Sequence, residues 1–283
     1  MFPVLFRIGS IPINSYGLAL AVSFLLGVKL AADRAGRLGY KASDIADLGV
    51  WVMMAAIAGS RAFYVATHLS QFRGHWLDVI AFWKGLYGLS MLGGVILAMI
   101  TAFIYIAVRK WDAMSLADAA IPSFMLGNFI TRIGCFFNGC CFGSPTSCSL
   151  GVSFPEGSLP WSVFGSAPLH PTQLYDSAAG LLILILLLWA DRKGHFRGFV
   201  FVLFLGLYGA TRFGIEEFRY FDHATNDLLG YSRFAGRAGV TDNQVISLLM
   251  AASAFVLGPI LYLRDRRAAG RVQAGPVART TKR

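Results

Sequence analysis

Charged side chains are scarce in this sequence. They make up 14% of the 283 residues, and only 15 of them are acidic, against 25 lysines and arginines. Hydrophobic residues make up 56% of the chain, and the mean hydropathy is +0.59. A soluble domain does not need so much apolar surface and so little charge. The composition therefore excludes an ordinary soluble domain and indicates an integral membrane protein.

The apolar residues fall into long runs. A spanning helix takes about 20 such residues, and the runs lack the alternation with a period of two residues that a membrane barrel requires. Because backbone groups in lipid must bond within the segment, the runs indicate helices. The sequence predicts an all-α integral membrane protein with seven transmembrane helices, at residues 14–32, 45–66, 86–108, 114–135, 171–190, 198–218 and 242–263.

Several features are missing from the ends and the loops. The first apolar run lacks a short basic segment before it and a small-residue cleavage site after it, so we expect it to stay in the mature protein. No internal repeat or low-complexity stretch is visible. The net charge of +10 lacks the aromatic interleaving or fold of a nucleic-acid-binding surface, so we expect no nucleic-acid partner.

The basic residues predict an orientation instead. When alternate loops are assigned to the cytoplasm, fifteen lysines and arginines fall on that side and six on the other. Basic residues concentrate in cytoplasmic loops. We therefore expect the N-terminus outside and the C-terminus in the cytoplasm.

This orientation divides the chain into parts. Residues 1–264 would form the membrane domain, and residues 138–170 within it a small loop domain on the outer side, the periplasmic side in a bacterium. Residues 265–283 would form a flexible, basic cytoplasmic tail. A second outer segment is expected at 219–241. Glycine and proline punctuate 138–170, which favours turns and short strands packed on the helices.

Residues 131–143, with the sequence TRIGCFFNGCCFG, stand at the end of the fourth apolar run. An arginine at mid-membrane costs about 2.5–3.5 kcal/mol, so it normally faces a partner, a water-filled cavity or an anion. We therefore interpret Arg132 as the anchor of a functional site, close to Asn138.

The sixth predicted helix carries a polar stripe. Tyr208, Arg212 and Glu216 follow one another in steps of four residues, so they share one helix face. An Arg212–Glu216 pair that only fixes packing would give the same pattern. Two arginines on different helices would instead form a forked receptor for phosphate, such as the headgroup of an anionic lipid. Tyr16 and Arg61 on the first two helices, and His170 before the fifth, complete the polar set.

Taken together and in order, six motifs resemble the prolipoprotein diacylglyceryl transferase family. The enzymes of this family act in the bacterial inner membrane and move diacylglycerol from phosphatidylglycerol to the cysteine of a lipoprotein precursor. The motifs are INSYGL at 13–18, GSR at 59–61, GLSMLGG at 88–94, the stretch from Arg132 to Gly143, LHPTQLY at 169–175, and YGATR at 208–212 followed by Glu216.

The resemblance implies a function and a site. The chain would transfer diacylglycerol to the lipobox cysteine, form a thioether and release glycerol phosphate. Its functional positions would be Tyr16, Arg132, Asn138, Gly143, Arg212 and Glu216, with His170, Gln173 and Tyr175 supporting the lipid cavity.

Each role can be stated chemically. Arg132 and Arg212 would stabilise the leaving phosphate, Glu216 would orient Arg212, and Asn138 would bond the headgroup. The general base stays open between His170, Tyr16 and Glu216. Tyr208 and Arg61 are expected to contact substrate.

The sequence departs from the commonest family signature at three places. Cys135 stands where Asn is usual, Cys140 where Glu is usual, and Leu92 where His or Tyr is frequent. We interpret these changes as a subtype and expect Cys135 and Cys140 at the substrate-binding site. The change at Leu92 argues against a simple mechanism with a histidine base.

The four cysteines allow three interpretations. A disulfide could join Cys148 to Cys140 or Cys141 on the oxidising outer side. A catalytic thiol is a second possibility. Zinc is the third, but the Cys-x4-Cys-Cys-x6-Cys spacing lacks the usual close ligand pairs. We therefore assign no metal and no cofactor from the sequence.

Two other functions compete with the transferase. One is a transporter or channel for an anionic solute, against which the odd number of helices and the lack of an inverted repeat both argue. The other is a non-catalytic lipid-binding relative, which would account for the altered signature.

Overall fold

The structure is a computed structural model, and it describes residues 4–9, 11–72, 78–79, 90–220 and 241–273. Within this part, seven helices are long and apolar enough to cross a membrane. The predicted all-α integral membrane fold is thereby confirmed. The elements are β1 Val4–Ile8, β2 Ile11–Asn14, α1 Ser15–Gly36, α2 Ala42–Thr67, η1 Leu69–Phe72, α3 Met91–Val108, α4 Ala113–Asn138, α5 Leu159–Phe164, α6 Thr172–Ala190, η4 Asp191–Lys193, α7 Phe199–Glu216 and α8 Asp242–Gln273.

The helix ends differ from the predicted ones in two instructive places. Helix α4 continues past the predicted end at 135 to Asn138. It thus carries the first half of the family signature, the stretch from Arg132 to Gly143. Helix α8 continues to Gln273, so residues 265–273 of the expected flexible tail are helical. Most of the second outer segment, residues 221–240, lies outside the described residues, as do 80–89 and 274–283.

A short hairpin precedes the first long helix and was missed by the sequence reasoning. Strands β1 and β2 are antiparallel, with Phe6 opposite Ile13 and Arg7 opposite Pro12. Gly9, in the turn, has a φ of 61°, a left-handed conformation that glycine adopts without strain. The signal in the sequence was a Gly-Ser pair between two short apolar segments.

The described chain divides into two compact units, residues 31–116 and the remainder. In the smaller unit, α2 packs on α3 where glycines face each other. A Cβ atom added to Gly59 would lie 2.4 Å from the carbonyl oxygen of Gly93. Small residues are the usual means of close helix packing in membranes, and here two motifs of the sequence supply them.

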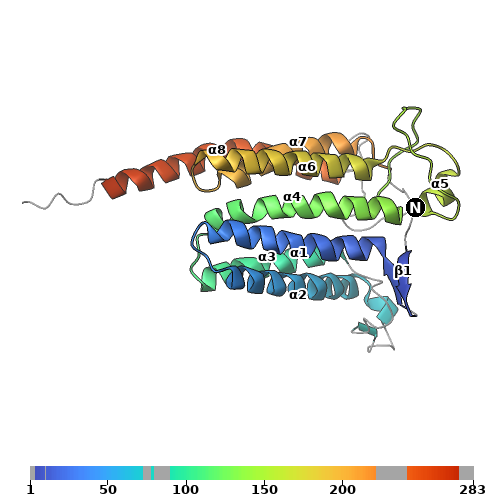
Figure 1. The fold of residues 1–283 in the computed structure, drawn as a ribbon, viewed down its shortest axis with the longest axis horizontal. Coiled ribbons are helices and arrows are strands. Elements are labelled where there is room, and N and C mark those ends of the chain that lie inside the picture. Colours follow the sequence, from blue (N-terminus) through green and yellow to red (C-terminus); the bar gives the residue numbers. More distant parts are fainter. Residues whose placement is uncertain (1–3, 10, 73–77, 80–89, 221–240, 274–283) are drawn as a thin grey trace, which may run out of the picture. The chain divides into compact units, whose positions relative to one another are not determined.

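The larger unit holds α4, α6, α7 and α8, and Figure 1 shows α6, α7 and α8 running side by side. Its core is a cluster of buried apolar side chains from α4, α6 and α7: Met125, Ile183, Leu184, Leu187, Val200, Phe204 and Leu205. Asp118 of α4 accepts hydrogen bonds from the backbone N–H groups of Gly198 (2.6 Å) and Phe201 (2.8 Å) at the start of α7. This carboxylate satisfies donors that a helix leaves free at its N-terminus.

Close helix contacts also depend on glycine in this unit. At Gly134 of α4, an added Cβ would lie 2.5 Å from the Cβ of Ala19 in α1, so α1 approaches the signature closely. Ser23 and Thr131 hydrogen-bond between the same helices at 3.0 Å. At Gly209 of α7, an added Cβ would lie 2.5 Å from the carbonyl oxygen of Ser247 in α8.

Two glycines on α7 provide a matched test of this packing. We expect Gly209→Ala to lower the melting temperature by several degrees, because the methyl group meets the backbone of α8. Gly214→Ala, on the same helix with nothing within 4 Å of the added Cβ, should leave it unchanged or raise it slightly. Thermal unfolding in detergent measures both. Equal melting temperatures for the two variants would contradict the proposed contact.

Candidate functional site

The signature turns sharply after α4 ends. Gly139 follows the helix with a φ of 79°, and the chain then reaches Gly143, which touches two other segments. Its N–H donates to the carbonyl of His170 (2.9 Å), and an added Cβ would lie 2.5 Å from the carbonyl oxygen of Phe218. Gly143 also forms a β-bridge with Arg219. Glycine is therefore required where three stretches of backbone meet.

An aromatic cluster holds this junction together. Phe142, Phe154 and Leu169 are buried in the loop segment between α4 and α6. The ring of Phe142 is stacked on Tyr220, with centroids 5.8 Å apart. The chain after α7 is thereby fixed against the end of the signature.

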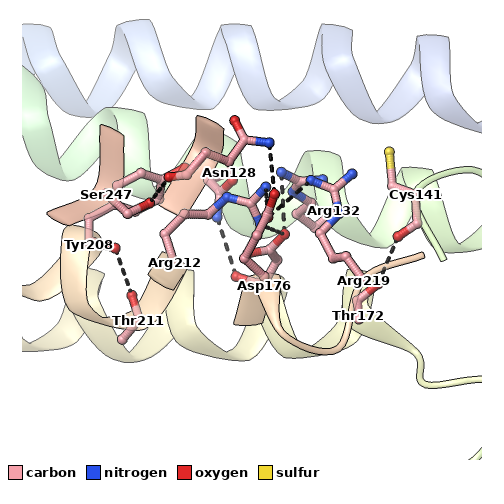
Figure 2. Close-up of polar contacts among 12 residues, drawn as sticks. Asn128, Arg132, Cys141, Thr172, Asp176, Tyr208, Thr211, Arg212, Arg219 and Ser247 are labelled. Carbon is pink, nitrogen blue, oxygen red and sulfur yellow. Dashed lines mark hydrogen bonds and ion pairs between the residues drawn. The ribbon is translucent and has the colours of Figure 1, made fainter. Parts of the chain in front are cut away.

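Two arginines from different helices meet one carboxylate oxygen. Arg132 Nη2 of α4 lies 3.3 Å from Asp176 Oδ2 of α6, and Arg212 Nη1 of α7 lies 3.4 Å from the same atom. Figure 2 shows both guanidinium groups converging on Asp176. The predicted proximity of Arg132 and Arg212 is thus present, and the atom that joins them is one the sequence reasoning gave no role.

A second buried carboxylate continues the network. Glu216 Oε2 lies 2.8 Å from Arg212 Nη2 and 3.6 Å from Arg219 Nη1. Its other oxygen accepts hydrogen bonds from Asn243 (2.8 Å) and Thr241 (3.4 Å). The i, i+4 pair read from the sequence is therefore real, and it belongs to a larger group that spans four helices.

The side chains of this network differ in their exposure. Among the described residues, the guanidinium groups of Arg132, Arg212 and Arg219 face the carboxylates of Asp176 and Glu216. The side chain of Arg132 is 19% exposed, whereas those of Arg212 and Glu216 are 10% and 0% exposed. Of the two arginines that meet Asp176, Arg132 is therefore more accessible to a ligand than Arg212. A guanidinium group with a partly accessible side chain at this depth is suited to an anionic ligand.

Three cysteines gather next to this network. The sulfur atoms of Cys135, Cys140 and Cys141 lie within 4.8 Å of one another. Cys141 has a φ of 61°, which is unusual for a residue with a side chain. Its carbonyl accepts a hydrogen bond from Thr172 (2.8 Å), and the carbonyl of Cys140 accepts one from Gln173 (2.8 Å).

Of the three interpretations of the cysteines, the structure does not contain the disulfide. All four cysteines are free, and Cys148 is exposed and outside the cluster. Hydrogen bonds with the Cys135 and Cys140 thiols lower the pKa of the Cys141 thiol, and the positive charges of Arg219 and Arg132 lower it further. The turn after α4 brings the sulfur atoms of Cys135, Cys140 and Cys141 together although the sequence spacing lacks the usual close ligand pairs.

Several predicted residues lie around these two groups. Tyr16 is close enough to the three thiols and to Arg132 to interact with them electrostatically. Asn138 lies within hydrogen-bonding reach of the Cys140 thiol. Tyr208 lies one turn before Arg212 and stacks on Phe204, with centroids 5.3 Å apart.

The remaining predicted residues lie in the loop segment and in the smaller unit. His170 Nδ1 is 3.2 Å from the hydroxyl of Tyr175. Gln173 is fully buried and holds the signature turn through Cys140. Arg61, in the smaller unit, donates to the backbone carbonyls of Val79 (2.9 Å) and Asp78 (2.6 Å).

Sequence reasoning gave no role to Asp176 or Arg219. A signal for Asp176 existed, because a carboxylate in the first turns of an apolar helix needs a partner. Arg219 follows the end of α7 and was counted among the outer loop residues. Its place depends on the β-bridge with Gly143, which the local sequence does not reveal.

The fold and the site define a class: a multi-pass membrane protein with a buried arginine–carboxylate network. The family model for prolipoprotein diacylglyceryl transferase matches residues 3–259, and the chain belongs to this family.

Similar proteins named phosphatidylglycerol–prolipoprotein diacylglyceryl transferase occur in several bacteria. One from Acaryochloris marina is 32% identical over 93% of this chain and 92% of its own length. One from a Nostoc species is 33% identical over 93% and 90%, and one from Clostridium perfringens is 36% identical over 77% and 83%.

The network can be tested through two aspartates in ion pairs of different depth. Asp176→Asn leaves two guanidinium groups without their carboxylate, and we expect it to cost about 3–5 kcal/mol of stability. Asp265→Asn removes a carboxylate 4.0 Å from Arg197, whose side chain is 69% exposed, and should change stability by less than about 1 kcal/mol. Unfolding of both purified variants in detergent measures the difference. Similar costs would show that Asp176 is not a structural centre.

Proposed function

We propose that this protein transfers diacylglycerol from phosphatidylglycerol to the cysteine of a prolipoprotein lipobox. The reaction forms a thioether and releases glycerol phosphate. Family membership supports this function, as do the names of the relatives. The observation that carries the proposal is the placement of Arg132 and Arg212 on one carboxylate oxygen inside an apolar helix bundle.

The two arginines suit a phosphodiester for geometric reasons. Each guanidinium has five N–H donors in a fixed plane, and the contact with Asp176 accounts for one nitrogen of each. The other N–H groups of Arg132 can donate hydrogen bonds to the phosphate oxygens. Since Asp176 holds the two groups together before substrate arrives, the charge that develops on the leaving glycerol phosphate meets donors already in place.

Glu216 fits the role of orienting Arg212. Its carboxylate is buried, faces two guanidinium groups and accepts two further hydrogen bonds. Both carboxylate oxygens of Glu216 therefore already face partners within the network. The general base stays a prediction with three candidates: Glu216, Tyr16, which neighbours the thiols, and His170, which lies within hydrogen-bond distance of Tyr175.

The acceptor would be the cysteine of a signal-peptide lipobox, presented from the outer side of the bacterial inner membrane. The excess of basic residues in the alternate loops supports this orientation. With this orientation, the signature turn and the loop segment would lie at the outer face of the inner membrane. An exported precursor and a phospholipid headgroup could both reach the site there.

Substitution of each arginine by lysine tests the phosphate contact. We expect Arg132→Lys and Arg212→Lys to keep the fold but lose transfer activity by on the order of 100-fold, because lysine lacks a planar fork. Arg109→Lys, at an exposed ion pair with Asp44 in the smaller unit, is the matched control. The assay follows thioether formation and glycerol phosphate release with phosphatidylglycerol and a lipobox peptide in liposomes.

The same assay separates the proposed function from its rivals. Full turnover in both lysine variants would contradict a forked phosphate receptor. A wild-type protein that moves an anionic solute across liposomes without making thioether would be a transporter, and one that only retains phosphatidylglycerol would be a binding protein.

The orientation can be read from a natural label site. Cys148 is exposed and lies in the loop segment, so a membrane-impermeant maleimide should label it in intact spheroplasts. Cys148→Ser should lose that portion of the label. Labelling that appears only after the membrane is opened would reverse the predicted topology and place the signature on the cytoplasmic side.

A further inference from the structure

The three clustered thiols form a site that the phosphate network does not explain. Cys135 is buried at the end of α4, while Cys140 and Cys141 are partly exposed on the turn that follows. Their sulfur atoms lie within 4.8 Å of one another. A group of three thiols is a typical set of ligands for a soft or borderline metal ion.

The distances suit a metal closely. Zinc binds thiolate sulfur at about 2.3 Å, so two sulfur ligands of a tetrahedral ion lie about 3.8 Å apart. The sulfur atoms of the cluster, all within 4.8 Å of one another, are close to that spacing. Three protein ligands leave the fourth position free for water or substrate, which distinguishes a catalytic site from a structural one.

The backbone is built to present the third thiol. Cys141 adopts a left-handed φ of 61°, a conformation that costs energy for a residue with a Cβ atom. Two buried side chains of α6, Thr172 and Gln173, bond the carbonyls of Cys141 and Cys140 at 2.8 Å and hold the turn. The cluster is therefore preorganised by residues outside it.

The surrounding charge also suits a bound metal. Three thiolates and a divalent ion carry one net negative charge, and the positive charges of Arg132 and Arg219 act on Cys141. These two positive charges would therefore offset part of the negative charge of a metal held by three thiolates.

We propose that Cys135, Cys140 and Cys141 bind one zinc ion, and that the fourth position of this ion takes the thiol of the substrate cysteine. The second half of this inference rests on the proposed function. A metal-bound thiol is deprotonated outright. The site would therefore produce the substrate thiolate without a general base from the protein.

The step balances without any further reactant. When the substrate thiol binds the zinc, its proton passes to water. The sulfur then attacks the glycerol carbon, a C–S bond forms, and the C–O bond to phosphate breaks. Glycerol phosphate leaves with the bonding electron pair, and Arg132 and Arg212 stabilise its charge. The thioether, a weaker ligand than a thiolate, then leaves the metal.

Cobalt is a suitable probe for the site, because Co²⁺ in a tetrahedral thiolate site has characteristic charge-transfer and d–d absorption. The full-length protein, reduced with a phosphine and freed of metal, should bind one equivalent of Co²⁺. Cys148→Ser, which alters the exposed cysteine outside the cluster, should bind it equally well.

The cluster variants decide the first half of the inference. Cys140→Ser and Cys141→Ser alter partly exposed positions, so both should fold, and both should weaken Co²⁺ binding at least tenfold. Cys135→Ser should do the same but alters a buried position, so its folding is checked by thermal unfolding. Absence of binding by the reduced wild type, or equal binding by Cys140→Ser, would overturn the proposed site. So would oxidation of the cluster to a disulfide as its only reaction.

A lipobox peptide decides the second half. The peptide should raise the charge-transfer absorption of the cobalt-loaded protein and shift its d–d bands, whereas a peptide with Ser in place of Cys should not. Metal-depleted enzyme should lose transfer activity and regain it with Zn²⁺. Full activity without metal would overturn the inference and leave the proposed function standing. Binding of Co²⁺ and peptide thiol without any thioether product would instead contradict the proposed function.

Discussion

One carboxylate oxygen holds the site together. Asp176 Oδ2 lies within ion-pair distance of Arg132 and Arg212, which come from different helices and would repel each other without it. In an apolar bundle this repulsion is only weakly screened, and a lone arginine is costly. The contact therefore fixes α4, α6 and α7 at one depth. Glu216 extends the same alternation of charges to Arg219.

Glycine makes this arrangement of charges sterically possible. An added Cβ would lie 2.5 Å from the nearest atom of another segment at each of three glycines, Gly134, Gly143 and Gly209. At Gly134 helix α1 reaches the signature, at Gly143 the chain after α7 reaches it, and at Gly209 helix α8 meets α7. Polar side chains from four helices can then converge. The glycines of the family motifs thus shape the site by allowing other segments of the chain to approach closely.

Two chemical groups result, and they lie next to each other. The arginine–carboxylate network suits the phosphate that leaves, and the thiol cluster suits activation of the sulfur that attacks. Arg132 belongs to the first group and acts electrostatically on the second. The substitutions at Cys135 and Cys140, which set this sequence apart from the commonest signature, become parts of one cluster. Under the proposed zinc site, the two substitutions would have one role, to supply thiol ligands in a subtype of the family.

The sequence by itself determined the class, the seven spans and the ion pair between Arg212 and Glu216. Each depends on local composition or on helical spacing, which neighbouring residues alone decide. Only the tertiary structure decided that Asp176 joins the two arginines, that Arg219 enters the network, and that three cysteines with unfavourable spacing meet. These contacts depend on how helices far apart in the chain pack and on how one turn reverses. The distances between helices are not encoded in any short stretch of sequence, and the spacing of the three cysteines within residues 135–141 does not by itself define the turn that brings their sulfur atoms together.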